Sequence, residues 1–131
     1  MASKDLYNNI GVKESLAPAS RIAAVNGTGI DLKGYESAVV VIERGAAGGT
    51  TPSFTFEVQE SDDDSTYTAV ANANLQGSEP TVTAAGTPIK IGYLGSKRYI
   101  RAAITAASGT TPTLLCAASV ILGNARDNPV A

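Results

Sequence analysis

The alternation of apolar and polar residues is clearest over residues 53–61. Its apolar positions, beginning with Phe54 and Phe56, lie two residues apart and are separated by polar ones. This period is typical of a strand with one buried and one solvated face. Turn-forming residues at 62–65 and renewed alternation over 66–70 predict that this strand continues into a β-hairpin.

Other apolar segments predict further strands. Residues 38–42 are β-branched and apolar on both faces, which is typical of a central strand covered on two sides. The pattern does not settle which face of the segment 98–104 is buried. The Gly- and Pro-containing residues 45–52 predict a flexible loop. The remaining predicted strands or strand fragments lie at residues 20–25, 30–32, 81–83, 89–93, 98–104 and 114–122.

Seven or eight strands without a helical period predict an all-β fold built from two packed antiparallel sheets. An immunoglobulin-like β-sandwich and a jelly roll both meet that number of strands. We expect an extended N-terminal arm over residues 1–19, the β-sandwich domain over 20–123 and a polar C-terminal tail over 124–131. No internal repeat is visible at a period of 20 to 50 residues.

Composition limits the partners. The chain has 131 residues, enough for one domain, and a net charge of −2, so it lacks the broad positive field that attracts nucleic acid. It contains no run of about 18 apolar residues, and we therefore expect no membrane span. The first residues lack the apolar core of a secretory signal, so we expect the protein to fold in a cytoplasm.

The chain contains no histidine and one cysteine, Cys116. This excludes Ser-His-Asp and Cys-His catalysis, imidazole metal ligands and an intrachain disulfide. Cys116 lies in an apolar run, which favours a buried, inert thiol. We expect a protein that is not an enzyme and has no catalytic residue, no cofactor, no cofactor-binding residue and no metal site.

Acidic residues offer two further hypotheses. The run Asp62, Asp63, Asp64 gathers oxygen ligands that suit calcium, but the glycine and distant glutamate of a helix-loop-helix calcium site are missing, so a solvated turn is the default interpretation. A carboxylate pair for glycoside hydrolysis needs two carboxyl groups at a fixed separation, and sugar sites also use aromatic platforms. The chain has no Trp and few other aromatic residues, which weighs against both a hydrolase and a lectin. The carboxylates considered are Glu57, Glu60, Asp63 and Glu79.

Two groups of residues are candidates for contact with a protein partner. Arg98 and Arg101 belong to the only basic cluster that contains an aromatic residue, although such residues also cover sheet edges or pair with carboxylates. In the predicted arm, apolar side chains can anchor the segment on a neighbour or add a strand to its sheet. The alternative for the arm is a disordered terminus. The anchors are Leu6, Tyr7, Ile10 and Val12.

Several segments, taken in order, resemble small structural proteins encoded beside the major capsid gene in tailed bacteriophages. They are Gly29-Ile30-Asp31-Leu32-Lys33-Gly34-Tyr35, the hairpin with Glu60-Ser61-Asp62-Asp63 and Tyr67-Thr68-Ala69-Val70, the segment from Gly92 to Arg101, and the closing residues from Ile121 to Pro129. The resemblance covers about residues 20 to 130, and its hairpin is also similar to β-sandwich domains of phage tails.

The resemblance implies a capsid decoration or cement protein. Such proteins have sandwich or jelly-roll folds and sit as oligomers across capsomer junctions. It therefore implies two partners, the major capsid protein and further copies of this chain, a place on the capsid exterior, and no catalytic residue. The alternatives are a tail or neck component of a virion and a ligand-binding or carbohydrate-binding β-sandwich module.

Overall fold

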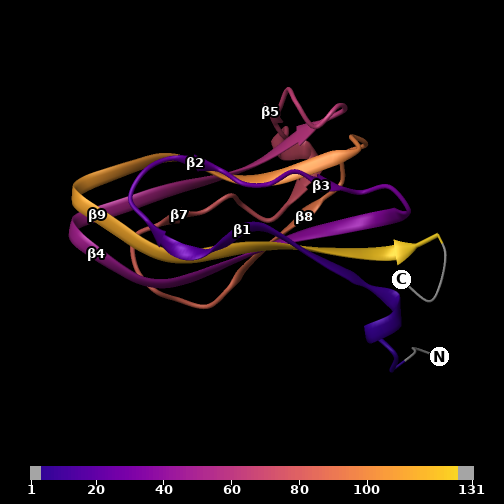
Figure 1. Ribbon diagram of the computed structural model, residues 1–131, viewed down its shortest axis with the longest axis horizontal. Coiled ribbons are helices and arrows are strands. Elements are labelled where there is room, and N and C mark those ends of the chain that lie inside the picture. The colour runs from indigo at the N-terminus through magenta and orange to yellow at the C-terminus, as the bar shows by residue number, and fades with distance from the viewer. Residues whose placement is uncertain (1–3, 127–131) are drawn as a thin grey trace.

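The computed structural model describes residues 4–126, which form antiparallel strands joined by turns (Figure 1). The predicted all-β, antiparallel fold is confirmed. The strands are β1 (Gly11–Arg21), β2 (Val25–Asn26), β3 (Ile30–Asp31), β4 (Tyr35–Ser61), β5 (Thr68–Ala69), β6 (Leu75–Gln76), β7 (Thr81–Val82), β8 (Ile89–Tyr93) and β9 (Tyr99–Ala125), with short 3-10 helices η1 (Tyr7–Asn9) and η2 (Asn72–Asn74).

Two long strands, β4 and β9, organise the molecule. They pair along their whole length, from Tyr35 opposite Ala125 to Ser61 opposite Tyr99. Both bend sharply at the same place, so that the sheet folds back on itself (Figure 1). All strands belong to one hydrogen-bonded sheet with the order β1-β9-β4-β8-β6 and with β2, β3, β5 and β7 attached to the long strands. The predicted loop at residues 45–52 is therefore wrong, because these residues remain in β4.

The folded sheet has two layers. The lower layer in Figure 1 contains β1, the C-terminal half of β9, the N-terminal half of β4, and β8 with β6. The upper layer contains β2, β3, the N-terminal half of β9, the C-terminal half of β4, and β5 with β7. The hydrophobic core lies between the layers. The choice between an immunoglobulin-like and a jelly-roll topology stays a prediction.

The two bends repeat each other in sequence. Ala46-Ala47-Gly48-Gly49-Thr50-Thr51-Pro52-Ser53 in β4 matches Ala106-Ala107-Ser108-Gly109-Thr110-Thr111-Pro112-Thr113 in β9, sixty positions later. Thr50 lies opposite Thr110. Gly49 and Gly109 have φ values of 90° and 113°, and a side chain at either would meet backbone carbonyl oxygens of the opposite bend. The matched segments thus let two paired strands turn together.

The repeat extends to the strand pairing. The short strands β1, β2 and β3 of the first half of the chain pair with β9, whereas β5, β7 and β8 of the second half pair with β4. The registers correspond as well. Val40 of β4 and Ile100 of β9 lie sixty positions apart, and Val40 pairs with Ile91 of β8 as Ile100 pairs with Ile30 of β3. The molecule therefore has a pseudo-twofold axis between its bends. Its sixty-residue spacing is longer than the periods tested on the sequence.

The core confirms several predicted strands. Phe54, Phe56 and Val58 are fully buried, as their alternation predicts. The sequence pattern did not settle which face of residues 98–104 is buried. In the structure, Ile100 and Ile104 point into the core. Cys116 is buried, and this burial raises the pKa of its thiol, as expected of an inert side chain.

The N-terminal boundary differs from the expected one. Residues 11–19, expected in an arm, lie in β1 at the edge of the sheet. The register shifts between Glu14 and Leu16, and again before Ala19, so Ser15 and Leu16 are buried in succession. These irregularities removed the alternation that marks a strand, and Pro18 is tolerated because β1 is an edge strand. At the other end β9 continues to Ala125, while residues 127–131 of the expected tail lie outside the described residues.

Ser15 joins the two layers. Its buried hydroxyl donates a hydrogen bond to the carbonyl oxygen of Thr28 at 2.9 Å and accepts one from the backbone N–H of Ala102 at 3.0 Å. The backbone of Thr28 donates in return to the carbonyl oxygen of Ser15 at 2.7 Å. One side chain therefore ties the edge of the lower layer to β9 in the upper layer.

We expect Ser15→Ala to lower the free energy of unfolding by about 1–3 kcal/mol, because it leaves the buried amide of Ala102 and the partly buried carbonyl of Thr28 without their partner. Urea unfolding monitored by circular dichroism measures the change. Ser20→Ala removes an exposed hydroxyl from the same strand and is the control. Equal stability of the two variants would contradict a role for Ser15 in joining the layers.

The bends also carry strain. Thr51 and Thr111 have φ values of 48° and 46°, which are unfavourable for a β-branched residue, and each precedes a proline. Since asparagine adopts this conformation more readily, we expect Thr111→Asn to raise the free energy of unfolding by up to about 1 kcal/mol. Thr110→Asn, at a neighbouring position without positive φ, should give no gain. Chemical denaturation of both variants tests this, and a loss of stability at position 111 would contradict it.

Candidate partner-binding surfaces

The N-terminal segment presents large apolar side chains to solvent. Asp5 begins a turn in which its carboxylate accepts hydrogen bonds from the backbone and side-chain N–H groups of Asn8 at 3.1 and 2.9 Å. These bonds, above all that from the side chain, lower the pKa of Asp5. The turn leads into η1 and leaves Leu6 64% and Tyr7 88% exposed.

The other two predicted anchors continue this surface. Ile10 is half-buried and, with Leu6, lines a hollow against Asn124 at the end of β9. Val12 lies in β1 opposite Ile121 and is 61% exposed. The four anchors therefore follow one path, from η1 past the end of β9 onto the outer face of the lower layer.

Arg98 lies at the open end of the folded sheet, opposite the bends. Its guanidinium donates two hydrogen bonds to the carboxylate of Asp31, at 2.9 and 2.8 Å, and lies over the ring of Tyr99. The hydrogen bonds from Arg98 lower the pKa of Asp31 from its ordinary value of 3.8 to about 2. The contact joins β3 to the start of β9, so Arg98 pairs with a carboxylate of its own chain.

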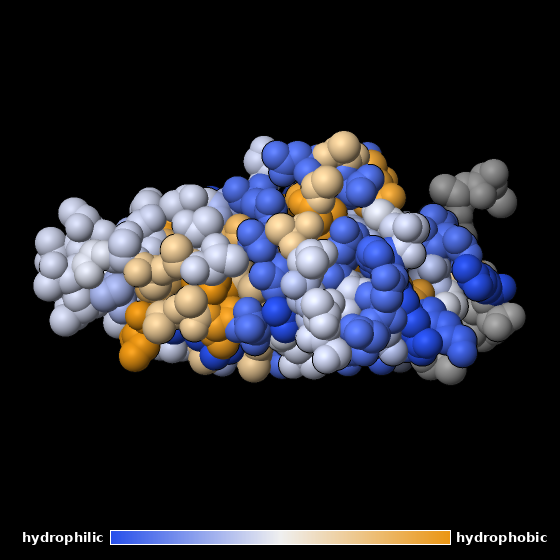
Figure 2. Space-filling model, turned by 90° about the horizontal axis from the view of Figure 1, so that it is seen from above, coloured by the Kyte–Doolittle hydropathy of each residue, from blue (hydrophilic) through white to orange (hydrophobic). Residues whose placement is uncertain are grey.

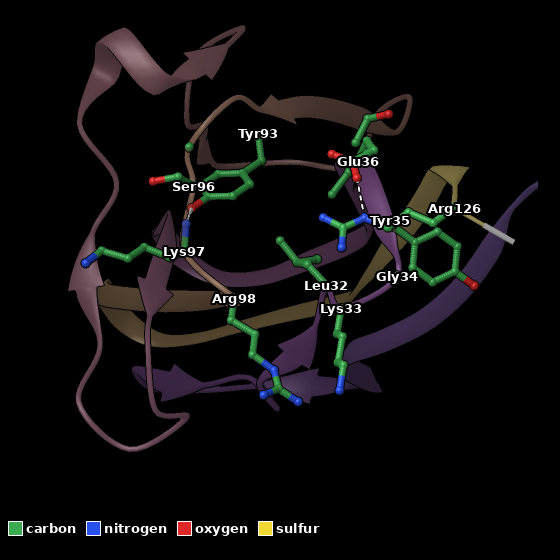
Figure 3. Close-up of a pocket in the computed structure, with 13 residues that line it drawn as sticks. Leu32, Lys33, Gly34, Tyr35, Glu36, Tyr93, Ser96, Lys97, Arg98 and Arg126 are labelled. Carbon is green, nitrogen blue, oxygen red and sulfur yellow. Dashed lines mark hydrogen bonds and ion pairs between the residues drawn. The ribbon is translucent and has the colours of Figure 1, made fainter.

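A cleft surrounds this end of the molecule (Figure 3). Leu32 and Tyr93 lie toward its middle, and Lys33, Lys97, Arg98 and Arg126 extend around it (Figure 3). Three of these cations are already paired, Lys97 with Asp62, Arg98 with Asp31 and Arg126 with Glu36. The cleft is therefore a charged, mostly neutralised surface.

Arg101 lies elsewhere, on the outer face of the upper layer. Its guanidinium donates a hydrogen bond to the side-chain oxygen of Gln59 at 2.7 Å and stacks over the ring of Tyr67, 4.0 Å from its centre. The structure thus separates the two arginines that the sequence places together. The six predicted contact residues occupy three places, the N-terminal path, the open end and the upper face.

The acidic hairpin is a hydrogen-bonded turn. The carboxylate of Asp63 accepts hydrogen bonds from the backbone of Ser65 and Thr66, and these bonds lower its pKa. Asp64 accepts one from the hydroxyl of Tyr67, and Asp62 pairs with Lys97. The three carboxylates therefore serve different partners. Within residues 4–126, no group of three or more acidic, cysteine or histidine side chains gathers as metal ligands do.

Comparison with protein-family models finds no match, and comparison with curated protein sequences finds no significant relative. Among the described residues, no helix is long and apolar enough to cross a membrane.

The outer face of the lower layer is a surface that the sequence did not predict. Val39 and Val41 of β4 point away from the core and are half-buried, although the apolar run at 38–42 predicted a strand covered on both sides. Within the described chain, only the inward face of this strand meets the core. The apolar residues on both faces of the segment 38–42 are the sequence signal from which this surface could have been predicted.

We expect Asp31→Asn to reduce stability in a pH-dependent way. Because folding lowers the pKa of Asp31 to about 2, its ion pair contributes stability above the unfolded value near 3.8, and this contribution is lost as the pH falls toward 2. The difference in unfolding free energy between the wild type and the variant should therefore be present at pH 7 and be lost as the pH falls through about 2. It should be small, because the pair is partly exposed. Urea titrations across this range measure it, and a pH-independent difference would contradict the ion pair.

Proposed function

We propose that the protein is a non-enzymatic virion component that decorates and stabilises a bacteriophage capsid. It binds the major capsid protein across capsomer junctions, on the capsid exterior, and acts as a homo-oligomer. The observation that carries the proposal is the exposure of Leu6 and Tyr7 on an ordered turn beside the sheet. Large apolar side chains held in water in this way are typical of contact with another protein. The resemblance of the strand segments to capsid decoration proteins supports the same function.

The position of these side chains suits attachment to a shell. They precede β1, whose outer edge carries backbone groups that a strand of a neighbouring protein can pair with. Pro18 lacks an N–H and restricts such pairing toward the end of β1, so the first part of the strand is the better template. Many copies of a modest contact of this kind reinforce a symmetric shell without one large interface.

Co-sedimentation of the purified protein with expanded, empty phage heads that lack it tests the function. We expect saturable binding at a fixed ratio to the major capsid protein. Leu6→Ala combined with Tyr7→Ala should weaken binding roughly tenfold or more, since a truncated aromatic anchor commonly costs at least that much. Ile22→Ala removes another exposed apolar side chain, located between β1 and β2, and should bind as the wild type does.

Absence of binding to heads at low and moderate salt would overturn the capsid function. Labelling that places the protein on the tail or neck would assign it there instead. Normal binding by the Leu6 and Tyr7 variant would retain the function but remove the N-terminal segment from the contact.

A further inference from the structure

The outer face of the lower layer carries a row of apolar residues that runs across its strands. Val12 of β1 lies opposite Ile121 of β9, which lies opposite Val39 of β4, and Val39 lies opposite Gly92 of β8. In β9, β4 and β8 the residues on either side point into the core, and Val12 itself is 61% exposed, so this row points outward. At the end of the row Gln76 of β6 lies opposite Gly92, and along the row Val39 and Ile121 are half-buried and Val12 is exposed. The row is a continuous apolar stripe across a sheet face.

The pseudo-twofold axis supplies an internal comparison. It relates the outer face of the lower layer to that of the upper layer, with the same strand geometry. There, Tyr99 and Ser61 stand in the places of Val39 and Ile121 of the stripe, and Arg101 stands in the place of Val41. Figure 2 is seen from above and shows hydrophilic surface toward the open end, with pale and apolar areas toward the bends. Because the backbone allows polar residues at these positions, the fold does not require the apolar stripe below.

We propose that a second copy of this chain covers the outer face of the lower layer. The two copies are related by a twofold axis that lies in the interface and runs parallel to β4 and β9, between them. Rotation about this axis places β9 over β4 of the partner and β1 over its β8. Ile121 then meets Val39 of the other copy, so that the centres of the two stripes pack together.

The charges beside the stripe favour this arrangement. The next row across the sheet is Glu14, Ser119, Val41 and Lys90, with an acid at one end and a base at the other. Within the described residues neither Glu14 nor Lys90 forms an ion pair. The twofold rotation places each Glu14 opposite Lys90 of the other copy. The face is thus complementary in charge to itself, as a symmetric interface requires.

The shape of the face agrees with its charge. At one end of the stripe, Val12 projects from the edge strand and is 61% exposed. At the other end, Gly92 has no side chain, and the side chain of Gln76 occupies the space that one would take, beside a hollow lined by Lys90 and Val39. The same rotation places Val12 of one copy over Gly92 of the other. The projecting Val12 of each copy therefore faces the Gln76 side chain and the hollow beside it in the other copy.

This interface specifies the homo-oligomer of the proposed function, and its test involves only this chain, so the capsid function and the interface can fail separately. Its test is the mass of the full-length protein in solution, measured by sedimentation equilibrium without capsids. We expect the wild type to form a dimer. Glu14→Lys places two lysines opposite each other, and Lys90→Glu places two glutamates, so each variant alone should dissociate at least tenfold more readily.

An equimolar mixture of the Glu14→Lys and Lys90→Glu variants should restore a dimer of one copy of each, because every facing pair then joins a lysine to a glutamate. Glu57→Lys makes the same change in charge as Glu14→Lys on the outer face of the upper layer and should leave the dimer intact. Thermal unfolding checks that each variant is folded. A monomeric wild type, single variants that associate normally, or a mixture that associates no better than its components would each overturn the interface.

Discussion

The hydrogen-bonded ladder between β4 and β9 is the constraint on which the rest of the structure depends. Because the two strands pair from end to end, neither can bend unless the other bends at the same point. This explains why the same Ala-Ala, Gly-Thr-Thr-Pro pattern occurs in both, with glycines placed where the opposite backbone approaches most closely. The shared bend brings the two layers together, and the core forms between them. It also joins residues that are distant in the chain, such as Tyr35 and Ala125, so folding requires the closure of long loops.

The exchange of short strands makes the two halves of the chain dependent on each other. Most short strands pair with the long strand of the other half, since β1, β2 and β3 need β9 while β5, β7 and β8 need β4. The halves therefore resemble two intertwined subunits within one chain. Ser15 strengthens this arrangement, because its hydroxyl contacts backbone of both halves inside the protein. A polar bridge in an otherwise apolar core also fixes the register of the irregular strand β1.

Local patterns predicted local features well. The alternation at Phe54 and Phe56, the hairpin after Ser61 and the strand at residues 89–93 follow from the sequence because each depends on neighbouring residues. The continuity of β4 does not, because glycine, threonine and proline at a bend within a strand look the same as those in a loop. The edge strand β1 was missed because its register shifts disrupt the period. In the candidate site, Arg98 was identified as a candidate contact, but its carboxylate partner, Asp31, lies 67 residues away in the chain and depends on the tertiary fold.

The two layers have nearly the same backbone, so their equivalent residues can be compared. Residues that are alike in both layers reflect the needs of folding, whereas residues that differ reflect the surroundings of each face. Where the two layers place equivalent residues inward, both are apolar, as with Val40 and Ile100, because both contribute to one core. Where they place equivalent residues outward, folding imposes no such demand and the residues diverge. Arg101 stacks on Tyr67, donates a hydrogen bond to Gln59 and has a charged group that water solvates. Val41, at the equivalent position, has an apolar side chain that water does not solvate favourably. The difference between Arg101 and Val41 therefore supports the proposal that a second copy of the chain covers the lower face.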